Sequence, residues 1–264
     1  MAQLAEDFKV IDADTHYTEP YDLWTSRAPK GYGNRVFHME EREGLPTWVV
    51  DGNEIGFARG GGVVARDSSK LPFLDSMEMG LDWVHEGAFD PQARLRLMDE
   101  IGVHAQVLFP NVVGLGGSTL NNMIPDLALR IMCLQIYNDA MAEMMTDSGN
   151  RFIPMTLMPA WDVDLCIEET KRAAGLGLRG INMTSDPQDA GSPDLASRAW
   201  DPSHVKAGSR CSSAASRTSM SGSRTVGGSS APPLVVKSEG AVGLRARTSI
   251  ESTSQSNSPV LTVL

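Results

Sequence analysis

The residues of this chain best suited to chemistry are Asp14 and His16, which lie two positions apart near the N-terminus. Asp14 is the last residue of the apolar segment 9–14 (KVIDAD), and His16 follows shortly after it. The β-branched residues of this segment predict a buried strand. Alternate residues of a strand point to the same side, so both side chains can face one point. A carboxylate beside an imidazole suits Zn²⁺, Mn²⁺ or Fe²⁺. The spacing alone is common, and the simpler alternative is that Asp14 caps a turn while His16 is packed or solvated.

Three further polar residues follow predicted strands and are candidate substrate contacts. Glu19 either orients His16 or touches substrate, and the alternative is a solvated loop acid. Asn111 and Asn182 lie at the ends of later strands, where an amide can hold a substrate carboxylate or carbonyl. The alternative for both asparagines is that they satisfy backbone groups of their loops.

The elements that must position these residues alternate between strand and helix. Apolar runs predict strands at 9–14, 105–109, 152–158 and 178–183, with helices at 92–101, at 125–146 and from Asp162 or Asp164 to Ala174. This alternation predicts an α/β fold with a parallel sheet and crossover helices, and it fits an open doubly wound sheet or a closed barrel. Residues 17–89 are irregular, with a hairpin expected at 47–55 around Asp51-Gly52, and predict an insertion over one end of the domain.

Composition narrows the class of partner and the compartment. The formal net charge of −10 disfavours binding to nucleic acid or to an anionic membrane surface. The N-terminus lacks the pattern of a signal peptide, and no apolar stretch is long enough to span a bilayer. The three cysteines show neither metal spacing nor pairing, which favours a reducing compartment. We therefore expect a cytoplasmic protein that acts on a small-molecule substrate, and a homo-oligomer remains open.

The composition changes abruptly near residue 203. Residues 204–264 hold 15 serines, no aspartate and no aromatic residue. Their charge is 5 Arg plus 2 Lys minus 2 Glu, or +5, which leaves −15 for residues 1–203. So few large apolar groups predict a segment without a packed core, and we expect 1–203 to be the folded domain and 204–264 a disordered tail. The tail is either a natural Ser/Arg-rich extension that binds an acidic partner, or the product of a reading-frame slip.

Several motifs in order resemble the amidohydrolase-2 family, the metal-dependent hydrolases and non-oxidative decarboxylases related to aminocarboxymuconate-semialdehyde decarboxylase. The resemblance covers residues 8–202 and rests on VIDADTHYTEP, DPQARLRLMDEIGVHAQVLFPN, YNDAMAE, RFIPMTLMPAWDVD, GLRGINMTSDPQD and AWDP. It implies a (β/α)₈ barrel of the TIM type with one divalent metal, usually zinc, in which Asp14 and His16 occupy the first-strand metal motif. The other ligands of such proteins, a histidine after strand five and an aspartate after strand eight, have no counterpart after Pro202.

The resemblance thus implies the N-terminal half of such a barrel, with a long insertion after its first strand. The implied function is a hydrolase acting on a small carbonyl or carboxylate substrate, with decarboxylation as the alternative chemistry. The family's general acid or base is not in this chain, so its catalytic residue is unknown and we expect the chain to be inactive. A non-catalytic half-barrel binding protein with a basic tail is a further alternative. An open-sheet nucleotide enzyme is disfavoured, because no glycine-rich phosphate motif follows the first strand.

The end of the resemblance coincides with the change in composition, which favours a frame slip near residues 202–206. Translation of the other two frames of the coding DNA from codon 203 should then encode a helix, followed by a strand that carries a histidine. Stop codons or low-complexity sequence in both frames would contradict the slip and favour a natural tail.

Overall fold

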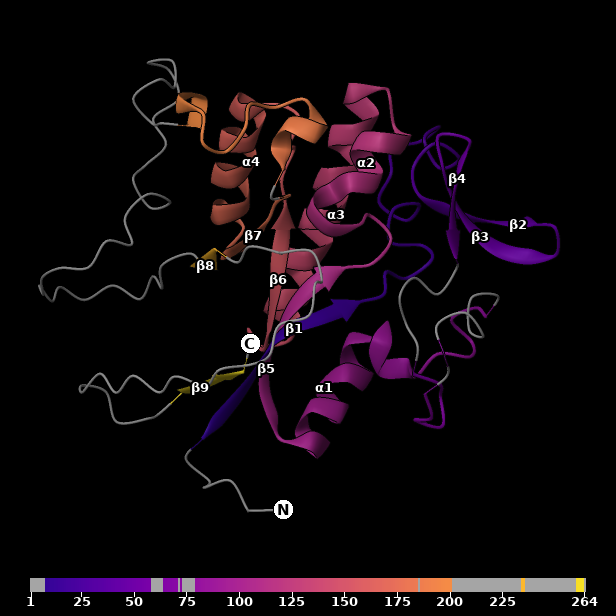
Figure 1. The fold of residues 1–264 in the computed structure, drawn as a ribbon. Helices are drawn as coiled ribbons and strands as arrows, with labels where there is room; N and C mark the ends of the chain where they lie inside the picture. Colours follow the sequence, from indigo (N-terminus) through magenta and orange to yellow (C-terminus); the bar gives the residue numbers. More distant parts are fainter. Residues whose placement is uncertain are drawn as a thin grey trace, which may run out of the picture.

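The computed structural model describes residues 8–57, 64–70, 72, 79–184, 186–200, 234–235 and 260–263. Within them lie a six-stranded parallel sheet and a separate three-stranded antiparallel sheet (Figure 1). The strands are β1 Lys9–Tyr17, β2 His38–Arg42, β3 Leu45–Val50, β4 Asn53–Phe57, β5 Val103–Pro110, β6 Phe152–Leu157, β7 Gly180–Asn182, β8 Leu234–Val235 and β9 Val260–Val263. The α-helices are α1 Pro91–Ile101, α2 Ser118–Met123, α3 Leu127–Asp147 and α4 Val163–Gly175. Short 3₁₀ helices are η2 Glu86–Ala88, η3 Leu115–Gly117, η4 Pro187–Ala190 and η5 Arg198–Trp200.

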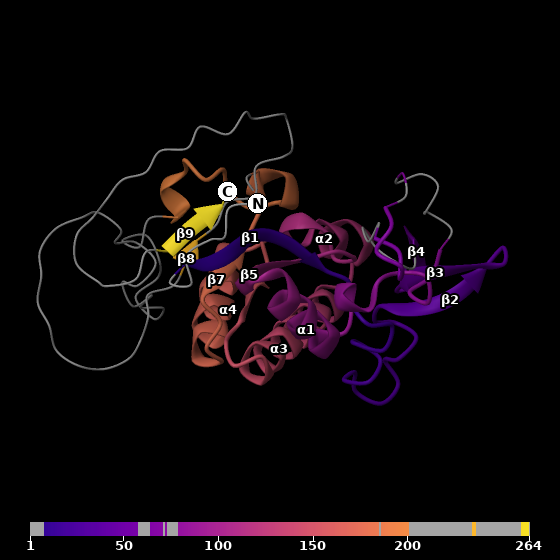
Figure 2. The same cartoon turned by 90° about the horizontal axis from the view of Figure 1, so that it is seen from below.

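The main sheet has the topology of a barrel arc. Strands β1, β5, β6 and β7 are parallel neighbours in chain order. The crossover helices α1, α3 and α4 all cover the same face of this sheet, as the view from below shows (Figure 2). A doubly wound sheet carries helices on both faces, whereas a barrel carries them all outside. The arrangement therefore favours the barrel over the open sheet, which the sequence pattern alone left undecided.

The predicted strands and crossover helices are confirmed, and local sequence explains where the helices begin. Asp90 caps α1 by accepting from the Ala93 backbone N–H, and Pro91 occupies the first helical position. Asp162, rather than Asp164, caps α4 by accepting from the Leu165 N–H. The short helix α2, which follows a glycine-containing loop after β5, was not predicted.

The insertion folds as its own antiparallel sheet, and its hairpin at Asp51-Gly52 is confirmed. Both turn residues have positive φ, 49° and 79°, as the tight hairpin requires. The sequence analysis missed β2, which pairs with β3 across a similar Glu43-Gly44 turn.

The insertion packs its aromatic residues against α3. Trp24 is fully buried, and its Nε1 donates to the Cys133 carbonyl oxygen at 2.9 Å. Its ring contacts Phe37, Trp48 and Tyr137, with centroids 4.5, 5.8 and 6.3 Å away. Helix α3 is therefore buried on the insertion side as well as on the sheet side, which explains why apolar residues recur all round it.

Two short strands beyond residue 200 pair with the ends of the arc. Strand β8 pairs with β7, and β9 pairs with β1 over residues 9–12. The sequence analysis did not predict this pairing. Backbone pairing needs no particular side chain, so composition did not predict it. The rest of the expected tail lies outside the described residues.

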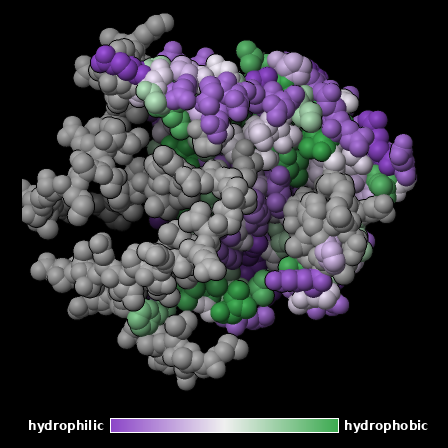
Figure 3. All heavy atoms as spheres, in the orientation of Figure 1, coloured by the Kyte–Doolittle hydropathy of each residue, from purple (hydrophilic) through white to green (hydrophobic). Residues whose placement is uncertain are grey.

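The visible surface carries scattered apolar residues. Among the described residues in Figure 3, hydrophobic side chains form small patches between polar ones. The exposed large hydrophobic residues are Phe8, Leu45, Ile101, Leu127, Leu176 and Leu195, which lie on different elements. Single exposed apolar residues are normal in globular proteins and do not by themselves indicate a partner. Over the described helices, none combines the length and apolar content needed to cross a membrane.

Because Trp24 joins the insertion to α3, its truncation should destabilise the whole domain. We expect Trp24→Ala to lower the free energy of unfolding by about 3–5 kcal/mol, the usual cost of removing a large buried aromatic side chain. Trp24→Phe keeps most of the packing and should cost clearly less. Urea denaturation followed by circular dichroism measures both. Equal stability of Trp24→Ala and the parent chain would contradict this role.

Candidate metal centre

The register between β1 and β5 shifts between Asp12 and Thr15, a stretch that includes the candidate ligand Asp14. Asp12 aligns with Gln106, but Thr15 aligns with Leu108, so three steps along β1 match two along β5. Such a bulge adds one residue to β1 and so changes which of the following side chains point to each face of the sheet. Leu108 and Tyr17 belong to the main core under the helices. Thr15 therefore faces the helices, and its neighbours Asp14 and His16 face the opposite, open side.

His16 lies beside Phe109, on the face of the sheet away from the helices. The two residues are aligned partners, with ring centroids 6.1 Å apart. Phe109 packs with Val107 and Met155 in a small apolar cluster separate from the main core. This face corresponds to the inside of a barrel, where active sites of such folds lie at the carboxyl ends of strands.

The His16 ring is oriented by a backbone carbonyl. Its Nδ1 donates to the Pro110 oxygen at 2.9 Å. A carbonyl only accepts, so the neutral ring carries its proton on Nδ1 and keeps a free lone pair on Nε2. This is the usual arrangement of metal-binding histidines in proteins. Both His16 and Asp14 are exposed, so a small ion can reach them.

Glu19 joins the end of β1 to the loop after β5 rather than lying in solvent. It is fully buried, and its two oxygens accept from the backbone N–H groups of Asn111 and Val112, each at 3.0 Å. Burial raises the pKa of the Glu19 carboxyl to about 7, although these backbone donors act in the opposite direction. These contacts of Glu19 join two loops, so a role in orienting His16 stays a prediction.

The two asparagines contact the loops at the carboxyl ends of the strands. Asn111 donates from Nδ2 to the Thr18 hydroxyl at 2.8 Å. Asn182 is buried, and its Oδ1 accepts from the Gly116 N–H at 3.0 Å. Gly116 approaches Thr184 so closely that a Cβ there would lie 2.5 Å from the Thr184 nitrogen. These bonds match the loop-satisfying alternative, and contact with substrate stays a prediction for both residues.

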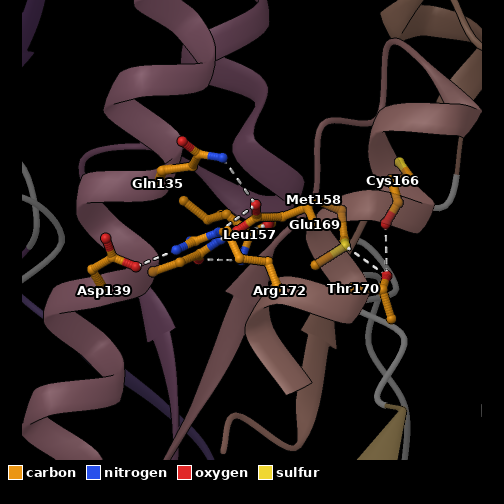
Figure 4. Close-up of polar contacts among 9 residues, drawn as sticks. Gln135, Asp139, Leu157, Met158, Cys166, Glu169, Thr170 and Arg172 are labelled. Atoms are coloured by element: carbon orange, nitrogen blue, oxygen red, sulfur yellow. Dashed lines mark hydrogen bonds and ion pairs between the residues drawn. The ribbon is translucent and has the colours of Figure 1, made fainter. Parts of the chain in front are cut away.

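Sequence reasoning missed a buried polar cluster that holds β6. The Asn138 amide bonds the Leu157 backbone on both sides, accepting from its N–H at 2.9 Å and donating to its oxygen at 3.0 Å. Glu169 of α4 accepts from Asn138 at 2.6 Å and pairs with Arg172, which also contacts Asp139 (Figure 4). The sequence signal that could have revealed this cluster is Asn138, a polar residue among the buried positions of α3. The cluster fixes the carboxyl end of β6 against α3 and α4.

A hollow of about 490 Å³ lies beyond the carboxyl ends of β6 and β7. Trp161, Asp162 and Asp164 line one part, and Gly191 and Ser192 line another. Neither Asp14 nor His16 is among the lining residues. The hollow is therefore separate from the predicted metal ligands.

Asp14 and His16 are both exposed near the carboxyl end of β1, but the described residues do not supply a complete set of metal ligands. Over that part of the chain, no group of three or more His, Cys, Asp or Glu side chains is arranged to hold a metal ion. Asp14 and His16 fit a divalent ion by chemistry and accessibility.

Comparison with known proteins identifies the fold. No family model and no curated protein matches the sequence. Among solved structures, an amidohydrolase from Mycobacterium avium subsp. paratuberculosis K-10 matches with a TM-score of 0.53 and 19% identity, over 75% of this chain and 56% of that one. The chain has the fold of part of this amidohydrolase. The predicted partial barrel is thereby confirmed, and the resemblance seen in the motifs is borne out at the level of fold.

Two decarboxylases also match, at lower structural similarity. The 2,6-dihydroxybenzoate decarboxylase from Rhizobium has a TM-score of 0.36 and 20% identity, over 70% of this chain and 41% of that one. A dihydroxybenzoic acid decarboxylase from Polaromonas sp. JS666, solved with manganese and 2-nitroresorcinol, has a TM-score of 0.36 and 18% identity, over 66% and 37%. The chain spans little more than half of the amidohydrolase and less of these two, and the fold assignment rests on the amidohydrolase.

The buried Glu19 predicts a pH-dependent stability. Its pKa rises from 4.5 to about 7 on folding, so the folded state binds the proton more tightly. Stability from this group is therefore complete below about pH 4.5 and is lost as the pH rises through 7, by about 3 kcal/mol in total. Glu19→Gln should remove this slope while losing one backbone acceptor. The control Glu168→Gln, on the exposed side of α4, should keep it.

Urea denaturation between pH 4.5 and 8 measures the slope for the parent chain and both variants. An identical slope in the parent chain and in Glu19→Gln would contradict the assignment of this pH dependence to Glu19.

Proposed function

We propose that this chain is the metal-binding half of an amidohydrolase-type barrel enzyme. Asp14 and His16 would hold one divalent ion, with zinc the expected metal and manganese or iron the alternatives. The observation that carries the proposal is the Nδ1 bond of His16 to Pro110, which leaves the Nε2 lone pair available to a ligand on the face where Asp14 is also exposed. That face is the inner side of a barrel arc, and the matched fold is that of an amidohydrolase.

The proposed reaction is hydrolysis of a small carbonyl or carboxylate substrate, with non-oxidative decarboxylation as the alternative. When bound, the ion would act as a Lewis acid toward a carbonyl or carboxylate oxygen. The chain's own contribution is to present His16 in one tautomer and Asp14 beside it. Glu19, Asn111 and Asn182 are proposed to keep the surrounding loops in place and to lie near the substrate.

Two protein ligands leave most of a metal's coordination shell to water, so we expect weak binding and no turnover by the 264-residue chain. Equilibrium dialysis against Zn²⁺ or Mn²⁺ should show one weak site that is lost in His16→Ala and in Asp14→Ala. His38→Ala is the matched control, because His38 lies in the insertion and contacts Val36 and Glu40. Binding that survives both ligand variants would contradict the proposed site.

Activity gives an independent check. Assays with small amides, lactones and hydroxybenzoates distinguish hydrolysis from release of CO₂. Stoichiometric tight zinc together with turnover of either kind would contradict the proposal that this chain carries only half of the site.

A further inference from the structure

The bulge in β1 depends on a carboxylate that is not a predicted metal ligand. Asp12 accepts from the Asp14 backbone N–H through Oδ1 at 3.3 Å and from Gln106 Nε2 through Oδ2 at 3.0 Å. The first bond closes a local turn within the strand, because side-chain oxygens of Asp bond the backbone two residues on. The second ties that turn to β5.

The bulge decides where Asp14 points. Asp12 aligns with Gln106, so a regular ladder would align Asp14 with Leu108 and His16 with Pro110. Leu108 is fully buried in the core under the helices. A regular strand would therefore direct Asp14 into that core, where an unpaired carboxylate is costly. One extra residue instead places Thr15 opposite Leu108 and leaves Asp14 exposed.

A buried arginine also bonds the backbone of β1, two residues beyond this turn. Arg94 of α1 is buried, and its guanidinium donates to the His16 carbonyl oxygen at 2.9 Å. Burial lowers the pKa of Arg94, and the negative charge of Asp12 is one of the effects that oppose this lowering. Among the described residues no carboxylate lies within ion-pair distance of Arg94, so the longer-range attraction of Asp12 partly compensates the buried charge.

We propose that Asp12 is a positioning residue whose carboxylate maintains the β1 bulge and so turns Asp14 and His16 onto the open face of the sheet, away from the core under the helices. This inference rests on the proposed metal site, since it explains how the two candidate ligands come to lie on the accessible face. It assigns no metal contact to Asp12 itself.

Two substitutions separate the hydrogen bonds of Asp12 from its charge. Asp12→Leu removes both acceptors. Asp12→Asn keeps an acceptor for the Asp14 N–H, and its new N–H₂ can donate to Gln106 Oε1 once the Gln106 amide turns over. That oxygen is buried without a hydrogen-bond partner in the structure as described, so the exchange replaces the bond from Gln106 Nε2 to residue 12 without breaking any bond of Oε1. Asp12→Asn should therefore rescue the geometry that Asp12→Leu loses.

The first readout needs no metal. In nuclear magnetic resonance spectra of the full chain, the His16 ring should show contacts with the Phe109 ring in the parent and in Asp12→Asn, but not in Asp12→Leu. Met98→Ala, on a fully buried residue of the same helix as Arg94, is the control for lost stability and should keep these contacts. Persistence of the contacts in Asp12→Leu would overturn the inference.

The second readout uses Mn²⁺ alone. The ion should broaden the resonances of Asp14 and His16 in the parent, and its dissociation constant should rise about tenfold or more in Asp12→Leu. Asp12→Asn and Met98→Ala should bind Mn²⁺ within a factor of about three of the parent. Equal affinity in Asp12→Leu and the parent would overturn the role of Asp12. Absence of broadening in the parent would overturn the metal site, while the metal-free contacts still decide the geometry.

Discussion

One extra residue in β1, between Asp12 and Thr15, determines what the open face of the sheet can do. Strand side chains alternate strictly, so without this bulge the residues that lie on the open face would lie in the core. Because of the bulge, the end of β1 contributes side chains both to the core and to the open face. Tyr17 packs in the main core under the helices, while Asp14 and His16 remain accessible on the other side.

The carboxyl end of β1 is held by polar contacts whose burial is costly. Glu19 is a fully buried carboxylate that bonds two backbone N–H groups of the neighbouring loop. Arg94 is a buried guanidinium bonded to the backbone of β1. Buried ionisable groups destabilise a fold unless they are compensated, and here both groups bond the backbone at or beside the carboxyl end of β1. The Asn138–Glu169–Arg172 cluster holds the end of β6 in a comparable way.

The sequence predicted the strands and crossover helices of the arc because they carry strong local signals, whereas the barrel itself was implied only by the resemblance to a family. Asp90-Pro91 and Gly102 bracket α1, and Asp51-Gly52 fixes a hairpin whatever surrounds it. The bulge and the buried polar contacts at the ends of β1 and β6 could not be predicted in this way. They depend on residues such as Gln106 and Asn138 that become neighbours of their partners only after the sheet forms. A buried Glu19 is likewise indistinguishable in sequence from a solvated loop acid, because its burial is set by the insertion and by β5.

The central claim is that Asp14 and His16 together face one ion on the open side of β1. Crystals of the full chain soaked in Mn²⁺ and measured at the manganese absorption edge test it most directly. The account predicts one anomalous peak about 2 Å from both a carboxylate oxygen of Asp14 and Nε2 of His16, with the His16 Nδ1 still bonded to Pro110. A peak bound by only one of these residues, or a peak at another site with these two side chains apart, would contradict it.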